Sequence, residues 1–217
     1  SDFAFQLYGN KDIINSELKR LNIKQSTIEN IIKIVHTDNI VSDEETPLTA
    51  IKNSKNTSMW NSVQAQVNNT ADITLSAGNT GVLLVISRMI LKTMKGVSKP
   101  ALAGLWPSKK DMSVVLDLGA NIECDEKNLI DFSELGSALY KAIFPKKIPS
   151  VALLNIGSEE IKGTDIIKKT YLKLKDLSKK NNFIFNGYIE GNKLMDGDSN
   201  VIITDGFTGN IALKTAE

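Results

Sequence analysis

Val114-Val-Leu-Asp-Leu-Gly-Ala-Asn121 joins a short apolar, β-branched run to a small, polar turn that contains a glycine. A run of this length and composition is typical of a buried strand. The same arrangement recurs in three other places, and each turn is followed by a helical pattern or by the start of one. The three are Asp72-Ile-Thr-Leu-Ser-Ala-Gly-Asn-Thr-Gly81, Val151-Ala-Leu-Leu-Asn-Ile-Gly-Ser-Glu-Glu160 and Val201-Ile-Ile-Thr-Asp-Gly-Phe-Thr-Gly-Asn210.

This repeated order of strand, turn and helix predicts an α/β fold. The apolar runs are too continuous for strands with one exposed face, so we expect a mostly parallel sheet that helices cover on both faces. No linker requires a second domain, and we expect a single α/β domain over residues 1–217. Turns at the carboxyl ends of parallel strands converge on one crevice, which binds ligand.

Apolar periodicity predicts the other elements along the chain. Strands are expected over residues 3–8, 31–36, 72–75, 101–106, 114–118, 151–156, 183–185 and 201–204. Helices are expected over residues 11–21, 47–52, 59–68, 80–94, 129–144 and 164–179.

Composition excludes several classes of function. A net charge of +1 gives no field that would attract nucleic acid, so no nucleic-acid partner is expected. One cysteine, Cys124, and one histidine, His36, are too few for a Cys/His metal site. A single cysteine allows no internal disulfide, which favours a reducing compartment such as the cytoplasm. G-x-G-x-x-G, P-loop and G-x-S-x-G motifs are all missing, so we expect no cofactor, no metal and no Ser–His–Asp hydrolase.

The turn at residues 76–81 offers the first candidate site. Gly78 lets the backbone approach a ligand closely, and the helix that follows offers free N–H groups and the positive end of its dipole. This chemistry suits phosphate or another oxyanion. Ser76, Gly78, Asn79 and Thr80 are therefore candidate substrate-binding residues, and a plain helix cap formed by Asn79 or Thr80 is the alternative.

Two further turns carry acidic and amide side chains. Asp117 and Asn121 are candidate substrate-binding residues, although Asp117 would serve equally well to fix its turn. The turn at residues 204–210 has more glycine, threonine and amide residues than a simple reversal of the chain needs. Asp205 and Thr208 are therefore candidates as well, with a helix cap as the alternative for Asp205.

The turn that begins at Asn155, another candidate substrate-binding residue, brings a well-placed cation. Lys162 lies between the end of a predicted strand and the next predicted helix. An ammonium group there can neutralise a phosphate or a developing oxyanion. The alternative is an ordinary surface lysine.

Taken together, these turns resemble, in order and spacing, the PlsX-type phosphate acyltransferases of bacteria. The matching motifs are Ser76-Ala-Gly-Asn-Thr-Gly81, Leu116-Asp-Leu-Gly-Ala-Asn121, Leu153-Leu-Asn-Ile-Gly-Ser-Glu159 and Thr204-Asp-Gly-Phe-Thr-Gly-Asn210. Weaker matches at residues 47–59, 99–103 and 186–190 extend the resemblance over nearly the whole chain.

The resemblance implies a reaction in which inorganic phosphate attacks the thioester of a long-chain acyl group on acyl carrier protein. The acyl phosphate formed enters phospholipid biosynthesis. Phosphate supplies the nucleophile, so the site has to bind and orient it and to stabilise an oxyanion. The resemblance assigns Lys162 to charge stabilisation and Asn210 to hydrogen bonding with phosphate or the oxyanion, and it makes the Asn79 turn and the turn from Asp117 to Asn121 lining of the site.

It also implies a three-layer α/β/α fold like that of isocitrate dehydrogenase, isopropylmalate dehydrogenase and phosphotransacetylase. Members of the family are cytoplasmic homodimers that contact the membrane through a helical region missing here. The family's opening D-A-M-G-G-D motif is missing too, and Lys52, Ser54-Lys55 and Thr164 depart from its pattern. We therefore expect a fragment of a longer member, with weak or no activity alone, which an acyl phosphate assay tests.

Two other functions remain open. A transferase that makes short-chain acyl phosphate from acyl-CoA would share the fold and the phosphate chemistry. A truncated, non-catalytic fragment that only binds the carrier protein would keep that binding in Lys162→Ala and show no turnover.

Overall fold

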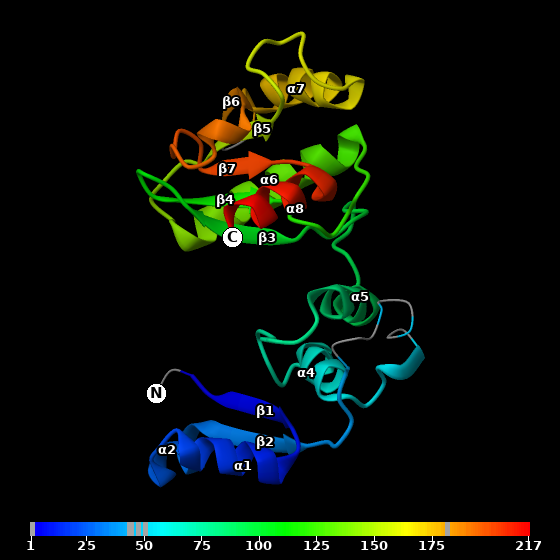
Figure 1. Cartoon of the computed structure of the whole chain (residues 1–217), viewed down its shortest axis with the longest axis vertical. Coiled ribbons are helices and arrows are strands. Elements are labelled where there is room, and N and C mark those ends of the chain that lie inside the picture. Colours follow the sequence, from blue (N-terminus) through cyan, green and yellow to red (C-terminus); the bar gives the residue numbers. More distant parts are fainter. Residues whose placement is uncertain (1–2, 43–45, 47–48, 50–51, 181–182) are drawn as a thin grey trace. The chain divides into compact units, whose positions relative to one another are not determined.

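The computed structural model describes all residues except 1–2, 43–45, 47–48, 50–51 and 181–182. The chain forms two compact units, unit 1 over residues 1–93 and unit 2 over residues 94–217. Figure 1 shows both with the element labels used below. The expectation of one domain over the whole chain stays a prediction, and the helix expected over residues 47–52 falls largely outside the described residues.

Unit 1 combines a two-stranded parallel sheet with helices. Its elements are β1 Phe5–Gly9, α1 Lys11–Arg20, α2 Gln25–Ile31, β2 Ile32–His36, α4 Ser58–Val67 and α5 Thr80–Leu91. Helix α1 begins after Asn10 because the Asn10 side chain accepts hydrogen bonds from the N–H groups of Asp12 and Ile13. Helices α4 and α5 pack on each other through a core that includes Val63 and Ile86.

Unit 2 is built on a five-stranded sheet with the order β3-β4-β7-β5-β6. Its elements are β3 Ala103–Pro107, β4 Met112–Leu116, α6 Glu126–Ile143, β5 Ser150–Leu154, α7 Asp165–Leu177, β6 Ile184–Ile189, the 3₁₀ helix η1 Gly191–Lys193, β7 Val201–Ile203 and α8 Gly206–Ala216. Strand β3 is antiparallel to β4, and every other pair is parallel. The predicted α/β class with a mostly parallel sheet is confirmed.

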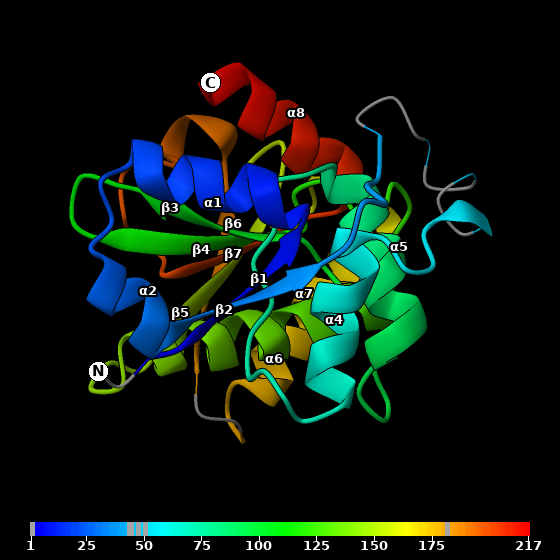
Figure 2. The same cartoon turned by 90° about the horizontal axis from the view of Figure 1, so that it is seen from below.

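Both faces of this sheet are buried, because alternate residues of a strand point to opposite faces. Val114, Val151 and Val201 belong to the core that α6 and α7 cover. Ala152 and Ile202 belong to the core on the other face, which α8 helps to cover. Figure 2 shows α6 and α8 on opposite sides of the strands. Burial on two faces explains why these strands are continuously apolar in sequence.

One predicted strand is wrong. Residues 72–79 contain no strand, although Ile73 lies in an apolar, β-branched run. The Thr74 hydroxyl donates to the main-chain carbonyl of Ser62 at 2.9 Å, so this segment is bound to helix α4 instead of to a neighbouring strand. The Ile73 side chain is largely exposed. In the described chain, only three of the four glycine-bearing turns therefore follow a strand.

Helix α2 and the 3₁₀ helix η1 were not predicted. The N-cap position of α2 is Lys24, which makes no side-chain cap, so the usual start signal of a helix is missing there. In the part of the chain that the structure describes, no helix is long and apolar enough to cross a membrane.

Candidate phosphate site at the sheet edge

Three glycine-bearing turns lie at one edge of the sheet of unit 2. Strands β4, β7 and β5 are neighbours and run parallel, so their carboxyl ends lie side by side (Figure 1). The turns that begin at Asp117, Thr204 and Asn155 follow these ends directly. This is the edge at which open α/β sheets bind ligands.

The carboxylate of Asp117 is the buried centre of the first turn. Its Oδ1 accepts hydrogen bonds from the N–H groups of Gly119 at 3.1 Å and Ala120 at 2.9 Å. The same atom accepts from the N–H group of Leu102 at 3.0 Å. Its Oδ2 accepts from the N–H group of Asn121 at 2.8 Å and from the Asn121 side chain at 2.7 Å. With five intramolecular donors, Asp117 fixes the turn, which is one of the two roles considered from sequence.

Asp205 caps helix α8 at the start of the turn after β7. Its Oδ1 accepts from the N–H group of Thr208 at 2.8 Å, and its Oδ2 accepts from the Thr208 hydroxyl at 3.0 Å. These contacts are those of an N-cap residue, the alternative considered for Asp205. The Thr208 oxygen keeps its capacity to accept a further hydrogen bond.

Hydrogen bonds join the turn after β4 to the start of α8. The N–H group of Gly206 donates to the carbonyl of Asn121 at 2.8 Å. A Cβ on Gly206 would lie 2.6 Å from that carbonyl oxygen, so only glycine fits this approach. The Nδ2 atom of Asn210 donates to the carbonyl of Leu118 at 3.3 Å. This bond uses one of the two amide hydrogens of Asn210 and fixes the side chain at the sheet edge.

Lys162 lies in the turn between β5 and α7. Its N–H group donates to the carbonyl of Glu159 at 3.0 Å, and its own carbonyl accepts from Asn155 Nδ2 at 3.2 Å. The side chain is exposed and forms no ion pair with any residue of the described chain, whereas Lys175 pairs with Glu160 at 3.3 Å. The ammonium group of Lys162 can therefore meet an anion without first losing a partner.

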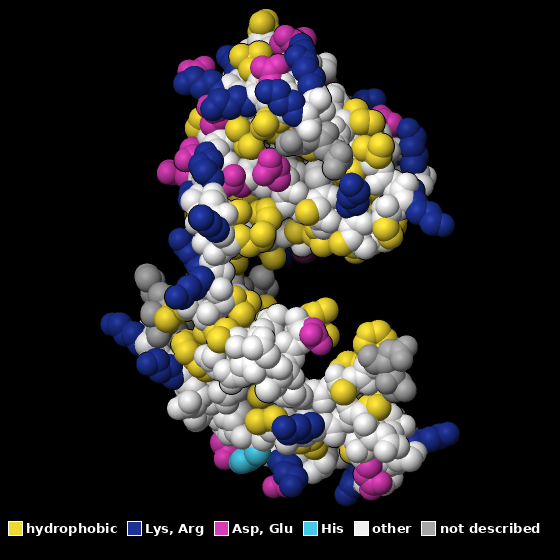
Figure 3. All heavy atoms as spheres, turned by 180° about the vertical axis from the view of Figure 1, so that it is seen from behind, with side chains coloured by type: hydrophobic (Ala, Val, Ile, Leu, Met, Phe, Trp, Pro, Cys, Tyr) yellow, Lys and Arg dark blue, Asp and Glu magenta, His cyan; other side chains and the backbone are white. Residues whose placement is uncertain are grey.

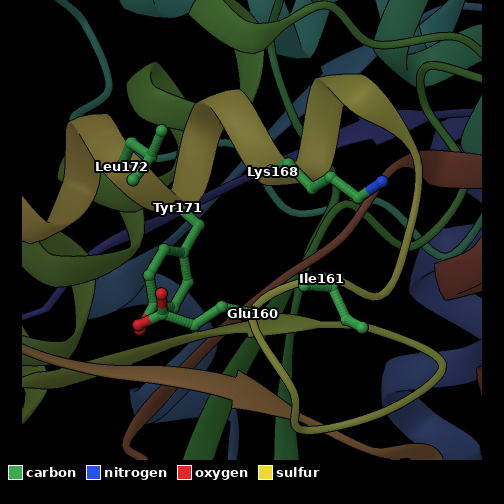
Figure 4. Close-up of a pocket in the computed structure, with 5 residues that line it drawn as sticks. All are labelled: Glu160, Ile161, Lys168, Tyr171 and Leu172. Carbon is green, nitrogen blue, oxygen red and sulfur yellow. The ribbon is translucent and has the colours of Figure 1, made fainter.

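A pocket of about 320 Å³ lies between this turn and helix α7 (Figure 4). The Tyr171 hydroxyl donates to Glu160 at 2.8 Å. This bond, together with the Lys175 ammonium, holds the pKa of Glu160 below its ordinary value. Burial, and then the same hydrogen bond, raises the pKa of Tyr171. Sequence reasoning missed this pocket, because its walls come from a turn and a helix surface: Glu160, Ile161, Lys168, Tyr171 and Leu172.

The remaining turn, at residues 76–81, belongs to unit 1, whereas the other seven predicted site residues belong to unit 2. The Ser76 hydroxyl accepts from the N–H group of Gly78 at 3.2 Å. Asn79 is the N-cap of α5 and accepts from the N–H group of Val82 at 3.1 Å, and Thr80 is the first residue of that helix. The helix-cap alternative therefore describes the Asn79 side chain.

Neither Cys124 nor His36 is placed as a nucleophile or a base. Burial is the main cause that raises the pKa of the Cys124 thiol to about 11, so the thiol stays protonated near neutral pH. Nδ1 of His36 accepts from the N–H group of Lys11 at 3.2 Å, at the start of α1. Among the described residues, no group of three His, Cys, Asp or Glu side chains could hold a metal ion.

Exposed apolar side chains adjoin the polar turns of unit 2. Ile122 follows the turn after β4, Ile156 and Ile161 lie in the turn after β5, and Phe207 lies in the first turn of α8. Figure 3 shows hydrophobic side chains lying between charged ones on one face of the molecule. Sequence reasoning did not single these residues out, although each follows a strand end by only a few residues. They offer apolar contacts beside the candidate site.

The chain matches, over residues 1–217, the family described as "Fatty acid synthesis protein". A protein named phosphate acyltransferase from Pelagibacter ubique is 54% identical over 215 residues, which are 98% of this chain and 62% of that protein. One of the same name from Maricaulis maris is 38% identical over 216 residues, 99% of this chain and 59% of that protein. The chain thus spans about three fifths of the length of these relatives.

Two solved structures share the fold. The EutD phosphotransacetylase from Staphylococcus aureus superposes with a TM-score of 0.66 at 18% identity, over 96% of this chain and 72% of that one. A branched-chain phosphotransacylase from Enterococcus faecalis gives a TM-score of 0.58 at 15% identity, over 98% of this chain and 84% of that one. At these identities the likeness concerns the fold, and it agrees with the predicted phosphotransacetylase-like arrangement.

Proposed function

This chain belongs to the fatty acid synthesis protein family, and we propose that it forms acyl phosphate from long-chain acyl carrier protein and inorganic phosphate, at the entrance to phospholipid biosynthesis. The names of its relatives support an acyltransferase that uses phosphate. The exposed apolar side chains beside the polar turns suit an acyl chain.

The observation that carries the proposal is the sheet edge itself. Among the described residues, the ammonium group of Lys162 forms no ion pair, and the amide of Asn210 is anchored to the carbonyl of Leu118. Cys124 is protonated near neutral pH, and His36 accepts a main-chain hydrogen bond in unit 1. A site of this kind suits a reaction in which the second substrate is the nucleophile.

The chemistry balances without a protein nucleophile. An oxygen of hydrogen phosphate attacks the thioester carbonyl carbon, and the carbonyl oxygen becomes an oxyanion. Collapse of this intermediate breaks the C–S bond, and the leaving thiolate takes the proton that the phosphate carried. Lys162 offsets the negative charge of phosphate and oxyanion, and Asn210 hydrogen-bonds one of them through its remaining amide hydrogen.

The partners that follow from this proposal are acyl carrier protein and inorganic phosphate. We propose in addition a cytoplasmic protein that pairs as a homodimer. Contact with the membrane would use parts of the family's architecture that lie outside these 217 residues.

The experiment that tests this function supplies phosphate with palmitoyl-acyl carrier protein or with acetyl-CoA, and traps acyl phosphate with hydroxylamine. Product from the long-chain donor, lost in Lys162→Ala, is the expected result. The matched control is Lys179→Ala, which removes a lysine paired with Asp176 on the surface of unit 2. Product from acetyl-CoA alone would favour the short-chain reaction. Carrier-protein binding that survives Lys162→Ala, with no product from either donor, would favour the binding fragment.

A further inference from the structure

The side chain of Asn155 crosses the turn that carries Lys162. Its Nδ2 atom donates to the carbonyls of Gly157 and Lys162, both at 3.2 Å. Its own N–H group donates to the carbonyl of Ile189 in β6 at 2.9 Å, which fixes Asn155 to the sheet. Two amide hydrogens are all that an asparagine side chain has. Both are used within the turn, and no donor is left for a ligand.

Two glycines allow the turn to close on this amide. Gly163 has φ +91°, and a Cβ there would lie closer than 3.0 Å to Asn155 Oδ1. A Cβ on Gly157 would lie 2.7 Å from Glu159 Oε2 and 3.1 Å from Lys162 Cγ, so both side chains pack against the backbone of Gly157. A side chain at position 163 would displace Asn155, and one at position 157 would displace Glu159 and press on the Lys162 stem.

The far side of the turn is fastened as well. The N–H group of Lys162 donates to the carbonyl of Glu159, and the neighbouring Glu160 accepts from Tyr171 of α7 (Figure 4). The main chain of Lys162 is thereby held from both directions. Its ammonium group is the part of the residue that remains free to meet an anion.

We infer that Asn155 is a positioning residue that holds Lys162 for phosphate, and that it does not bind phosphate itself. This inference rests on the proposed function and changes the substrate-binding role expected for Asn155 from sequence. Asn155→Asp keeps the shape but places a carboxylate against two carbonyl oxygens. Asn155→Ala removes the two donors without adding a charge.

The test is the affinity of the 217-residue chain for inorganic phosphate, measured by titration calorimetry at constant ionic strength. We expect Lys162→Ala to raise Kd about tenfold, because it removes one hydrogen bond between charged groups. Asn155→Ala and Asn155→Asp should each raise Kd by a similar factor. When Asn155→Ala is combined with Lys162→Ala, Kd should rise no further, because both changes remove the same interaction.

The matched control is Asn186→Ala. Asn186 also braces a turn of unit 2 with its amide, which donates to the Asp198 carbonyl and to Ser199 Oγ, both at 3.0 Å. We expect it to lower the unfolding temperature and to leave Kd unchanged. Thermal unfolding of every variant identifies any that fails to fold. If Asn155→Ala does not fold, the Kd of Asn155→Asp alone is compared with that of the unsubstituted chain.

The outcomes separate the inference from the function on which it rests. If the unsubstituted chain does not bind phosphate, or if Lys162→Ala binds it unchanged, the proposed function fails and the inference falls with it. If Lys162→Ala weakens binding and Asn155→Ala multiplies that effect, Asn155 contacts phosphate directly and the inference alone is overturned. Unchanged binding in the folded Asn155 variants overturns it as well.

Discussion

The carbonyl oxygen of Asp117 occupies the space that a Cβ on Gly209 would need, closer than 3.0 Å to that position. Helix α8 therefore approaches the turn after β4 without an intervening side chain. The approach places Asn210 within hydrogen-bonding reach of the Leu118 carbonyl. Gly209, which has no side chain, thereby determines where Asn210, a candidate catalytic residue, lies.

Gly209→Ala should destabilise the chain and displace Asn210. Its Cβ would meet the rigid main chain of Asp117, so we expect about 3 kcal/mol lost from the free energy of unfolding, the upper part of the range for overpacking. Urea denaturation measures this loss. Gly191→Ala is the control, because no atom lies within 4 Å of its Cβ position, and it should change stability by less than about 0.5 kcal/mol. Equal effects of the two substitutions would contradict the close approach.

Asp117→Asn should be costly although it keeps the size of the side chain. The buried carboxylate now accepts hydrogen bonds from main-chain N–H groups, and the NH₂ group of an asparagine would face some of these donors and could not accept from them. We therefore expect a loss of about 2–4 kcal/mol in unfolding free energy. Asp198→Asn, at an exposed ion pair with Lys110, should cost no more than about 1 kcal/mol. A mild effect of Asp117→Asn in urea denaturation would show that the carboxylate does not hold the turn.

Asp205 should behave as a helix cap. Asp205→Ala removes the acceptor of the Thr208 N–H group and should cost about 1 kcal/mol of unfolding free energy. Asp205→Asn keeps an acceptor of equal capping strength and should cost much less. Thermal or urea unfolding of the two variants measures both losses. An Asn variant as unstable as the Ala variant would mean that the charge of Asp205, and not its cap, stabilises the chain.

Cys124 should react slowly with alkylating agents. Because burial raises the pKa of the thiol to about 11, only a small fraction is thiolate near neutral pH. The rate of iodoacetamide labelling should rise about tenfold per pH unit up to about pH 10, with the fold followed by circular dichroism. Glutathione, an unhindered thiol, is the reference. A labelling rate that levels off near pH 9 would contradict the shifted pKa.

The strands of unit 2 could be predicted because burial on two faces is visible in sequence. The runs Val151–Leu154 and Val201–Ile203 are apolar at every position, and their burial confirms that interpretation. The run around Ile73 has a similar composition but no neighbouring strand, and its polar Thr74 binds α4. Composition alone did not distinguish a strand from a segment that is hydrogen-bonded to a helix.

The roles of single polar side chains were harder to predict. A sequence shows that Asp117 and Asn155 lie in turns. It does not show that the N–H group of Leu102 donates to Asp117, or that the Asn155 side chain reaches the carbonyl of Lys162, seven residues away. Those partners depend on how the strands are placed in the sheet. The roles of Lys162 and Asn210 in chemistry stay predictions, since their positions at the sheet edge are necessary for them but not sufficient.

We propose that phosphate, and not a side chain, attacks the thioester. The most direct measurement is a single-turnover experiment, with the chain equimolar to palmitoyl-acyl carrier protein so that slow chemistry is still visible. Thiol release and the intact mass of the chain are followed with and without inorganic phosphate. We predict thiol release that requires phosphate, acyl phosphate as its product and an unchanged protein mass. A palmitoyl adduct on the chain, or thiol release without phosphate, would show that a side chain or water attacks the thioester instead.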